Sequence, residues 1–353
     1  ADLIVVGRFC GSVSVAAVGS TTSITNLLVN FFVGLSAGAC VTVAHALGSR
    51  EDQVVHRTVH TALPTALISG LVLTVVGVTF ADTFLGLMGT PDNVLALSSV
   101  YMKIYFAGIT FTMVYNFCAA ILRAAGDTRS PLIYLTFAGI INVVLNVVFV
   151  TVFHMNVAGV ALATTISQGV SAALCRLHGL RVDAPYRVSI RAIRFHKESL
   201  FEIIRYGLPS GIQNSVIALA NVVVQSNINS FGKAAMAGCG AYSKIEGFAF
   251  LPITCFTMAL STFVGQNLGA KQYDRVKKIL WTCLAWVGVT GLVLGLGMYA
   301  FGPQLLSIYI SDSQEAIQYG LVRLGYICAV YFLCGLMDVT TGSLRGLGCP
   351  WRR

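Results

Sequence analysis

Charged side chains are scarce in this sequence. They make up 10% of its 353 residues, whereas hydrophobic residues make up 56%, and the mean hydropathy is +0.78. A soluble domain carries about 25% charged residues, so this composition excludes a water-facing globule. Apolar runs such as Pro64 to Phe80 and 276–301 reach the roughly 17–25 residues that cross a bilayer. The sequence therefore predicts an all-α polytopic membrane protein.

The sequence also lacks the motifs of an enzyme or of an ATP-driven pump. It contains no Gly-x-x-x-x-Gly-Lys phosphate loop, and no nucleophile with a neighbouring base can be named. Its ten cysteines and six histidines show no CxxC or Cys/His ligand spacing. We therefore expect no enzymatic activity, no cofactor, no disulfide framework and no bound metal cofactor.

The net charge of +9 reflects basic residues that gather in alternate loops between ten predicted spans. These spans are 1–10, 16–46, 54–80, 94–122, 131–153, 157–177, 207–229, 235–267, 276–300 and 316–344. One set of loops holds 18 of the 23 basic residues, and the other 5 (Arg8, Lys103, Lys233, Lys244 and Arg323) lie near the opposite loops and outer helix ends. By the positive-inside rule the loops around Arg50, Arg129, Arg194 and Lys277 are cytoplasmic. The charge thus reports topology, and we expect no nucleic-acid partner.

The chain contains an internal repeat. "VTVAHALGSREDQVVHR" aligns with "TFVGQNLGAKQYDRVKK", so that Gly48 pairs with Gly269 (269 − 48 = 221). Further on, "ILRAAGDTRSP" aligns with "SLRGLGCPWRR", so that Arg123 pairs with Arg345 (345 − 123 = 222). Six helices per copy make the two copies parallel in the membrane. We expect two six-helix bundles truncated at both ends: an N-terminal bundle at 1–178 with a partial first helix, a cytoplasmic linker at 179–206, and the first four helices of a C-terminal bundle at 207–353.

The linker is basic and is predicted to carry an amphipathic helix near Lys197 to Tyr206. Two interpretations stay open for it. It is either a tether that adds to the charge bias, or a segment that binds lipid head groups.

The ordered motifs resemble those of the multidrug and toxic compound extrusion family. They are "DLIVVGRF", "VAHALGSREDQ", "LRAAGDTRSP", "GVALATTISQ", "VGQNLGAKQYD" and "SLRGLG", and they cover nearly the whole chain. The resemblance implies a twelve-helix antiporter of the plasma membrane that exports small organic, often cationic, compounds against H⁺ or Na⁺, and we expect it to be monomeric in the bilayer. A lipid-linked precursor flippase of the same superfamily and a membrane-embedded enzyme are the alternatives. Because the arginines are predicted to sit at the ends of the spans, the exporter is favoured over the flippase.

A polar trio is the predicted cation or proton site. Asp2 falls where the family has a first-helix carboxylate, and an intramembrane carboxylate usually faces the bundle interior. Asn142 and Asn146 lie one turn apart in an apolar run; Asn142 matches the family's asparagine, and Asn146 stands where the family commonly has an aspartate. Each residue also has an alternative role outside a cation site. Asp2 could be a solvated group at the end of its helix, and the asparagines could be interhelical hydrogen-bonding groups.

Further polar residues inside the predicted spans are expected to contact substrate or to support the site. Glu246 could instead pair with Lys244 at the membrane interface, and Asp338 only approximately matches a family carboxylate in spacing. The set is Tyr115, Asn116, Thr164, Gln168, Gln213, Asn214, Glu246 and Asp338.

Overall fold

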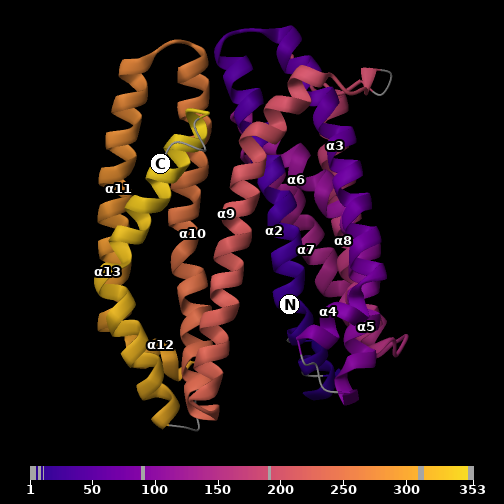
Figure 1. Ribbon diagram of the computed structural model, residues 1–353, viewed down its shortest axis with the longest axis vertical. Coiled ribbons are helices and arrows are strands. Elements are labelled where there is room, and N and C mark those ends of the chain that lie inside the picture. The colour runs from indigo at the N-terminus through magenta and orange to yellow at the C-terminus, as the bar shows by residue number, and fades with distance from the viewer. Residues whose placement is uncertain are drawn as a thin grey trace. The chain divides into compact units, whose positions relative to one another are not determined.

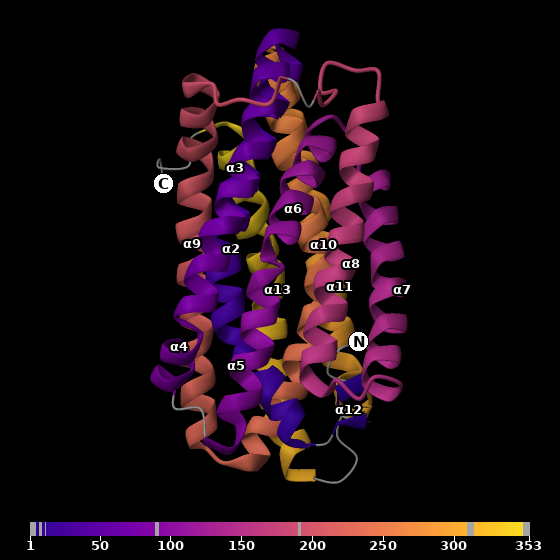
Figure 2. The same ribbon diagram turned by 90° about the vertical axis from the view of Figure 1, so that its right-hand side faces the viewer.

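The computed structural model describes residues 5–6, 9–10, 12–88, 92–189, 192–308 and 314–348, and its regular secondary structure over these ranges is helical (Figures 1 and 2). The elements are α2 (Ser12–Gly48), α3 (Asp52–Thr79), α4 (Ala81–Leu87), α5 (Asp92–Ala107), α6 (Ile109–Ala124), α7 (Arg129–Thr151), α8 (Asn156–Arg181), α9 (Lys197–Ser230), α10 (Lys233–Gly269), α11 (Tyr273–Ala300), α12 (Gly302–Ser307) and α13 (Gln314–Gly346).

Most of the predicted spans are present as long apolar helices. In the described part of the chain, 8 helices are long and apolar enough to cross a membrane. Helices α5 and α6 are bent by 45° at their junction, and if this pair forms one broken span, the number of candidate spans is 9. These helices coincide with nine of the ten predicted spans, while most of the span 1–10 lies outside the described residues. The prediction of an all-α polytopic membrane protein is confirmed.

The helix boundaries reproduce the internal repeat. Adding 221 to the bounds of α2 (12–48) gives the bounds of α10 (233–269), and adding 221 to those of α3 (52–79) gives those of α11 (273–300). Adding 222 to the start of α5 and the end of α6 (92 and 124) gives the bounds of α13 (314–346). Each copy therefore places its helix starts and stops at equivalent residues.

The turns between the helices repeat as well. Arg50 and Lys271, which are 221 residues apart, both adopt left-handed backbone with φ of 58° and 56°. Gly126 and Gly348, which are 222 residues apart, have φ of 91° and 67°. Left-handed backbone is strained for a residue with a Cβ and free of strain for glycine. The two glycines therefore end α6 and α13 at low cost.

The two copies differ at Gly108, which separates α5 from α6. A Cβ at this position would overlap the side chain of Thr165 on α8. The equivalent residue in the second copy is Val330 (108 + 222), and α13 continues through it without a break. The bend in the first copy thus coincides with a close approach of α8 that a larger residue would prevent.

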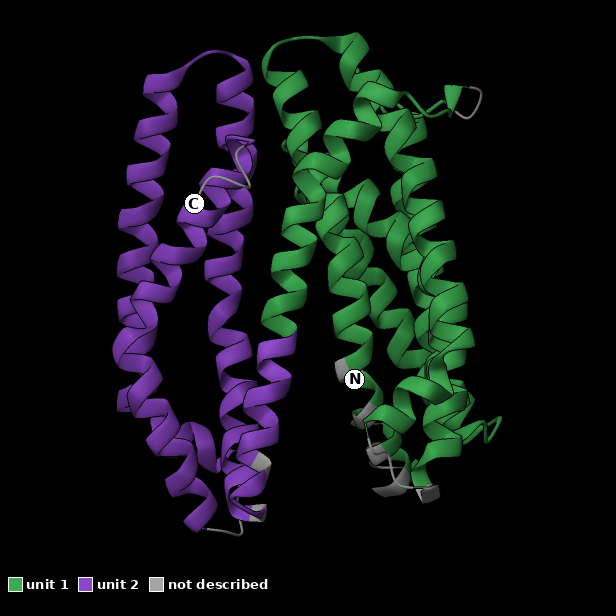
Figure 3. Ribbon diagram, viewed as in Figure 1, with its two compact units in different colours: residues 1–218 green, residues 219–353 purple. Residues whose placement is uncertain are grey.

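The chain forms two compact units, residues 1–218 and residues 219–353 (Figure 3). In the first unit, a core runs between α2, α3, α6 and α8, with Phe117 fully buried. In the second, Leu260, Val287 and Val339 join α10, α11 and α13. The division falls inside α9. The amphipathic helix predicted near Lys197 to Tyr206 and the span predicted at 207–229 form this one continuous helix, which runs through Pro209 to Ser230.

Glycines allow α2 and α9 to touch backbone to backbone within the first unit. Gly34 and Gly38 lie one turn apart on α2, and Gly207 and Gly211 lie one turn apart on α9. A Cβ added to Gly34 would meet the backbone of Gly211, and one added to Gly38 would meet the backbone of Gly207. This is the small-xxx-small pattern that brings membrane helices close together.

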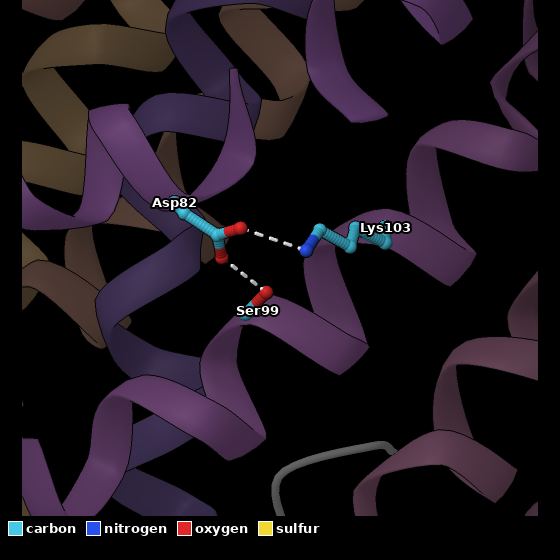
Figure 4. Close-up of polar contacts among 3 residues, drawn as sticks. All are labelled: Asp82, Ser99 and Lys103. Carbon is cyan, nitrogen blue, oxygen red and sulfur yellow. Dashed lines mark hydrogen bonds and ion pairs between the residues drawn. The ribbon is translucent and has the colours of Figure 1, made fainter. Parts of the chain in front are cut away.

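A small polar network joins α4 to α5 (Figure 4). The Asp82 carboxylate accepts hydrogen bonds from Lys103 Nζ at 2.8 Å and from Ser99 Oγ at 2.5 Å. The hydrogen bonds from Lys103 and Ser99 lower the pKa of Asp82. The side chain of Asp82 is 60% exposed, so the pair is a surface ion pair of modest strength.

Candidate functional site

The two asparagines of the predicted site join α7 to α8, which pack side by side (Figure 2). Asn146 Nδ2 donates to Asn142 Oδ1 at 3.1 Å, and Asn142 Nδ2 donates to Thr164 Oγ1 at 3.2 Å. Thr164 Oγ1 in turn donates to the Val160 carbonyl at 3.0 Å. The three side chains therefore form a directed hydrogen-bond chain that ends on the backbone of α8.

Both asparagines lie on the less exposed side of α7. Asn146 is 0% exposed and Asn142 is half-buried, whereas Ile140, Val143 and Val144 on the same helix are exposed and apolar. A buried amide is costly unless it is hydrogen-bonded, and the chain through Thr164 meets that requirement in part. The structure thus brings together three of the predicted site residues on one polar face.

Asp2, the acidic member of the predicted trio, lies outside the described residues. Its role as the coupling carboxylate stays a prediction.

The predicted residues on α6 mainly bond to nearby backbone. The Tyr115 hydroxyl donates to the Pro131 carbonyl at 3.1 Å, which ties α6 to the start of α7. Asn116 Nδ2 donates to the Thr112 carbonyl at 2.9 Å on its own helix. Tyr115 thus has a structural bond that accounts for its burial.

The remaining predicted residues of the first unit are half-buried. Gln168 Oε1 accepts from Ser171 Oγ at 3.4 Å, one turn along α8. Gln213 and Asn214 lie in α9, four and five residues after Pro209 (213 − 209 and 214 − 209). Among the described residues, none of these three side chains has a hydrogen bond to Asn142 or Asn146.

In the second unit, a polar cluster that includes Glu246 lies on α10 and α13. The guanidinium carbon of Arg323 lies 5.0 Å from the centre of the Tyr242 ring, and Glu246 is one turn beyond Tyr242 on α10. Tyr242 and Tyr331 are 0% and 1% exposed. Their hydroxyls and Arg323 Nη1 have no hydrogen-bond partner among the described residues.

Arg323 lies within a helix and not in a loop. The sequence analysis placed it at an outer helix end, but it lies nine residues into α13 (323 − 314) and is half-buried. At 1.5 Å per residue it stands about 13 Å from the start of the helix. Its cation–π contact with Tyr242 offsets part of the cost of a half-buried charge.

Asp338 is half-buried in α13. Its equivalent in the first copy is Asn116 (338 − 116 = 222), which occupies the matching place on α6. The repeat thus places an amide in one copy where the other has a carboxylate. Self-alignment beyond the loop motifs would have found this pair from the sequence.

Within the described residues, no group of three or more His, Cys, Asp or Glu side chains has the geometry of a metal site. A monovalent cation needs fewer charged ligands and would rely on carbonyl and amide oxygens. The side chains of Asn142, Asn146 and Thr164 carry such oxygens, whereas the positive charge of Arg323 beside Tyr242 disfavours a cation in the second cluster.

Comparison with known proteins covers almost all of the chain. The sequence profile of the MatE family matches residues 1–148 and 209–350. The chain is 29% identical to the probable multidrug resistance protein YoeA of Bacillus subtilis over 98% of this chain and 76% of that protein. It is 26% identical to a FAD transporter of Shewanella oneidensis over 86% of this chain and 68% of that protein. It is 22% identical to the multidrug export protein MepA of Staphylococcus aureus over 95% of this chain and 74% of that protein.

Solved structures show the same fold. A multidrug resistance MATE family transporter in an outward-facing conformation superposes with a TM-score of 0.91 at 22% identity, over 99% of this chain and 78% of that one. A MATE structure in a bent conformation superposes with a TM-score of 0.90 at 22% identity, over 99% of this chain and 77% of that one. The repeated helices, the loop motifs and these matches lead to one conclusion: the chain belongs to the MatE family of multidrug and toxic compound extrusion transporters.

Proposed function

We propose that this transporter is a secondary-active antiporter of the plasma membrane. It would export organic, cationic or amphipathic compounds in exchange for H⁺ or Na⁺, by alternating access between its two bundles. The observation that carries the proposal is the hydrogen-bond chain from Asn146 through Asn142 to Thr164 between two apolar helices, with Asn146 fully buried. Polar groups inside a membrane helix bundle usually mark an ion or substrate pathway.

Asp2, Asn142 and Asn146 are the residues that would couple the ion to transport. Asp2 is the one titratable member of this trio. It would take a proton, or offer its oxygens to Na⁺, a hard cation that prefers oxygen ligands. The amide oxygens of the asparagines would complete its surroundings without adding a second charge. Occupancy of the site would favour one facing state, because a ligand shifts a conformational equilibrium by its difference in affinity for the two states.

The names of the relatives support export, and they differ in substrate. YoeA and MepA are named as multidrug resistance or export proteins, whereas the Shewanella protein is named as a FAD transporter. An anionic dinucleotide and a cationic drug demand opposite charge in a binding site. We propose organic cations as the substrates, since Asp2 adds negative charge to the first bundle. The flippase alternative is not favoured by these relatives.

The test is efflux from energised membrane vesicles that contain the full-length protein, measured against pH and Na⁺. A cationic dye and FAD are assayed in parallel as substrates. Asp2→Asn should abolish gradient-driven efflux. If Asp2 faces the asparagines, as the proposal requires, Asn146→Asp would add a second carboxylate near it. Because two close carboxylates cannot both ionise easily, the pH or Na⁺ dependence of efflux should shift.

A structural role for the asparagines makes a different forecast. In that case Asn146→Asp lowers thermal stability through the buried charge and leaves the ion dependence unchanged. Normal transport by Asp2→Asn would move the coupling site elsewhere, and Asp338 would be the next residue to substitute. Efflux of FAD but not of the dye would refute the cationic substrate class.

A further inference from the structure

A polar groove lies where α3 begins, at the end of the first unit that the charge distribution predicts to be cytoplasmic. Its volume is about 620 Å³. One wall is the first two turns of α3, with Gln53, His56 and Arg57. The other is the segment between α8 and α9, with Arg187, Ser189 and His196.

The second wall is held in place by hydrogen bonds to α3. His60 is 0% exposed; its Nε2 accepts from the Ser189 backbone N–H at 2.8 Å, and its Nδ1 contacts the His56 carbonyl at 2.7 Å. Because Nε2 faces a donor and Nδ1 faces an acceptor, the ring carries its proton on Nδ1. A few residues on, the His196 backbone N–H donates to Thr61 Oγ1 at 3.1 Å. The groove is therefore preformed.

The anchored segment places Arg187 and Ser189 in the lining of the groove. Val188 is buried in the core of the first unit, and its N–H donates to the Gly179 carbonyl at 2.8 Å. Its neighbours Arg187 and Ser189 are exposed and line the groove instead. Arg57 faces them from α3.

The charge of the groove is positive. Two arginines line it against one carboxylate, that of Asp52, and neither Arg57 nor Arg187 forms an ion pair with a described residue. Burial lowers the pKa of His196, and the positive charges of Arg194 and Arg57 lower it further. The first turn of α3 adds the positive end of a helix dipole.

We propose that this groove binds a phosphate group, supplied either by the head group of an anionic phospholipid or by free phosphate. Two unpaired guanidinium groups match phosphate oxygens in geometry and charge, and the Ser189 hydroxyl adds a donor. Basic groups at the cytoplasmic membrane surface meet anionic head groups directly. A phosphate here would bridge α3 to the segment that leads into α9. The inference is independent of ion coupling and of the exported substrate.

The experiment uses the full chain in phosphatidylcholine nanodiscs, with the melting temperature and the His196 NMR signal as readouts. One arm adds phosphatidylglycerol to the bilayer, and the other titrates inorganic phosphate at constant ionic strength. The groove variant is Arg57→Gln with Arg187→Gln. The matched control is Arg129→Gln with Arg181→Gln, which removes two exposed charges near the same end but outside the groove.

Binding of a phosphate group should raise the melting temperature of the wild type and of the control, and raise the pKa of His196, because an anion offsets the nearby positive charge. At roughly 1 kcal/mol per basic side chain near anionic lipid, the groove variant should bind about 25-fold more weakly. A response to phosphatidylglycerol that phosphate competes away supports the lipid source, and a response to phosphate alone supports free phosphate. Equal responses of the groove variant and the control, or no response in either arm, would overturn the proposal.

Discussion

The substitution Gly38→Ala tests whether the backbone contact between α2 and α9 holds the first unit together. The new Cβ would lie 2.5 Å from the Gly207 nitrogen and 2.7 Å from the Gly207 Cα, and still closer to the Ile203 carbonyl oxygen. Carbon atoms pack at about 3.5–4.0 Å. All three neighbours are backbone atoms of a helix, so none can rotate away. The two helices must separate by about 1 Å.

The size of the effect follows from two opposing contributions. Overpacking of a tight contact costs about 1–3 kcal/mol, whereas alanine is favoured over glycine inside a helix by about 1 kcal/mol. Gly139→Ala is the matched control, since Gly139 lies in α7 and a Cβ there meets nothing within 4 Å. The propensity gain is common to both variants, so the difference between them isolates the packing cost of about 1–3 kcal/mol.

The assay is the free energy of unfolding in bicelles, measured for the wild type and both variants. Gly207→Ala on the facing helix provides a second check. Because the first alanine already separates the helices, the double variant should cost less than the sum of the two single variants. A Gly38→Ala protein as stable as Gly139→Ala would refute the close contact.

Three further predictions concern the His60 anchor, the Asp82 ion pair and the membrane topology. His60→Ala removes both hydrogen bonds of a buried ring and should cost about 1–3 kcal/mol, with faster amide exchange at Ser189; unchanged exchange at Ser189 would contradict the anchoring. Asp82 has a lowered pKa in the folded protein, so its contribution is present above the ordinary aspartate pKa and is lost as the pH falls through the folded value. Asp82→Asn should therefore cost less than about 1 kcal/mol at pH 7, and the gap to wild type should close on acidification; a gap that widens would reverse the sign of the reasoning. Cysteine accessibility should place Arg129 and Arg194 on the same side of the membrane, and opposite sides would rule out the parallel repeat.

Local features were predictable because they depend on neighbouring residues alone. The apolar runs, the spacing of Asn142 and Asn146 on one helix face, and the loop motifs that mark the repeat are all short-range patterns. The helix bounds of the two copies differ by 221 for α2 and α3 and by 222 for α5 and α6, so the two copies also keep equivalent helix ends. The family resemblance rests on these patterns and is confirmed by the matching family profile.

The partners of the polar side chains could not be predicted in the same way. Thr164 lies 22 residues from the asparagine that bonds to it, and Ser189 lies 129 residues from His60. Arg323 was assigned to a helix end because a charge near the start of a span usually belongs to the interface. Its actual place beside Tyr242 depends on how α10 packs against α13.

The sequence alone thus determined that the chain crosses the membrane, how often it repeats and which family it resembles, because hydrophobic length and periodicity act through local burial. Only the tertiary structure decided which polar groups meet. Gly34 approaches Gly211 and Asn142 bonds to Thr164 through helix packing. In a membrane such packing depends on shape and on a few hydrogen bonds rather than on hydrophobic burial, since lipid is as apolar as the helices it surrounds.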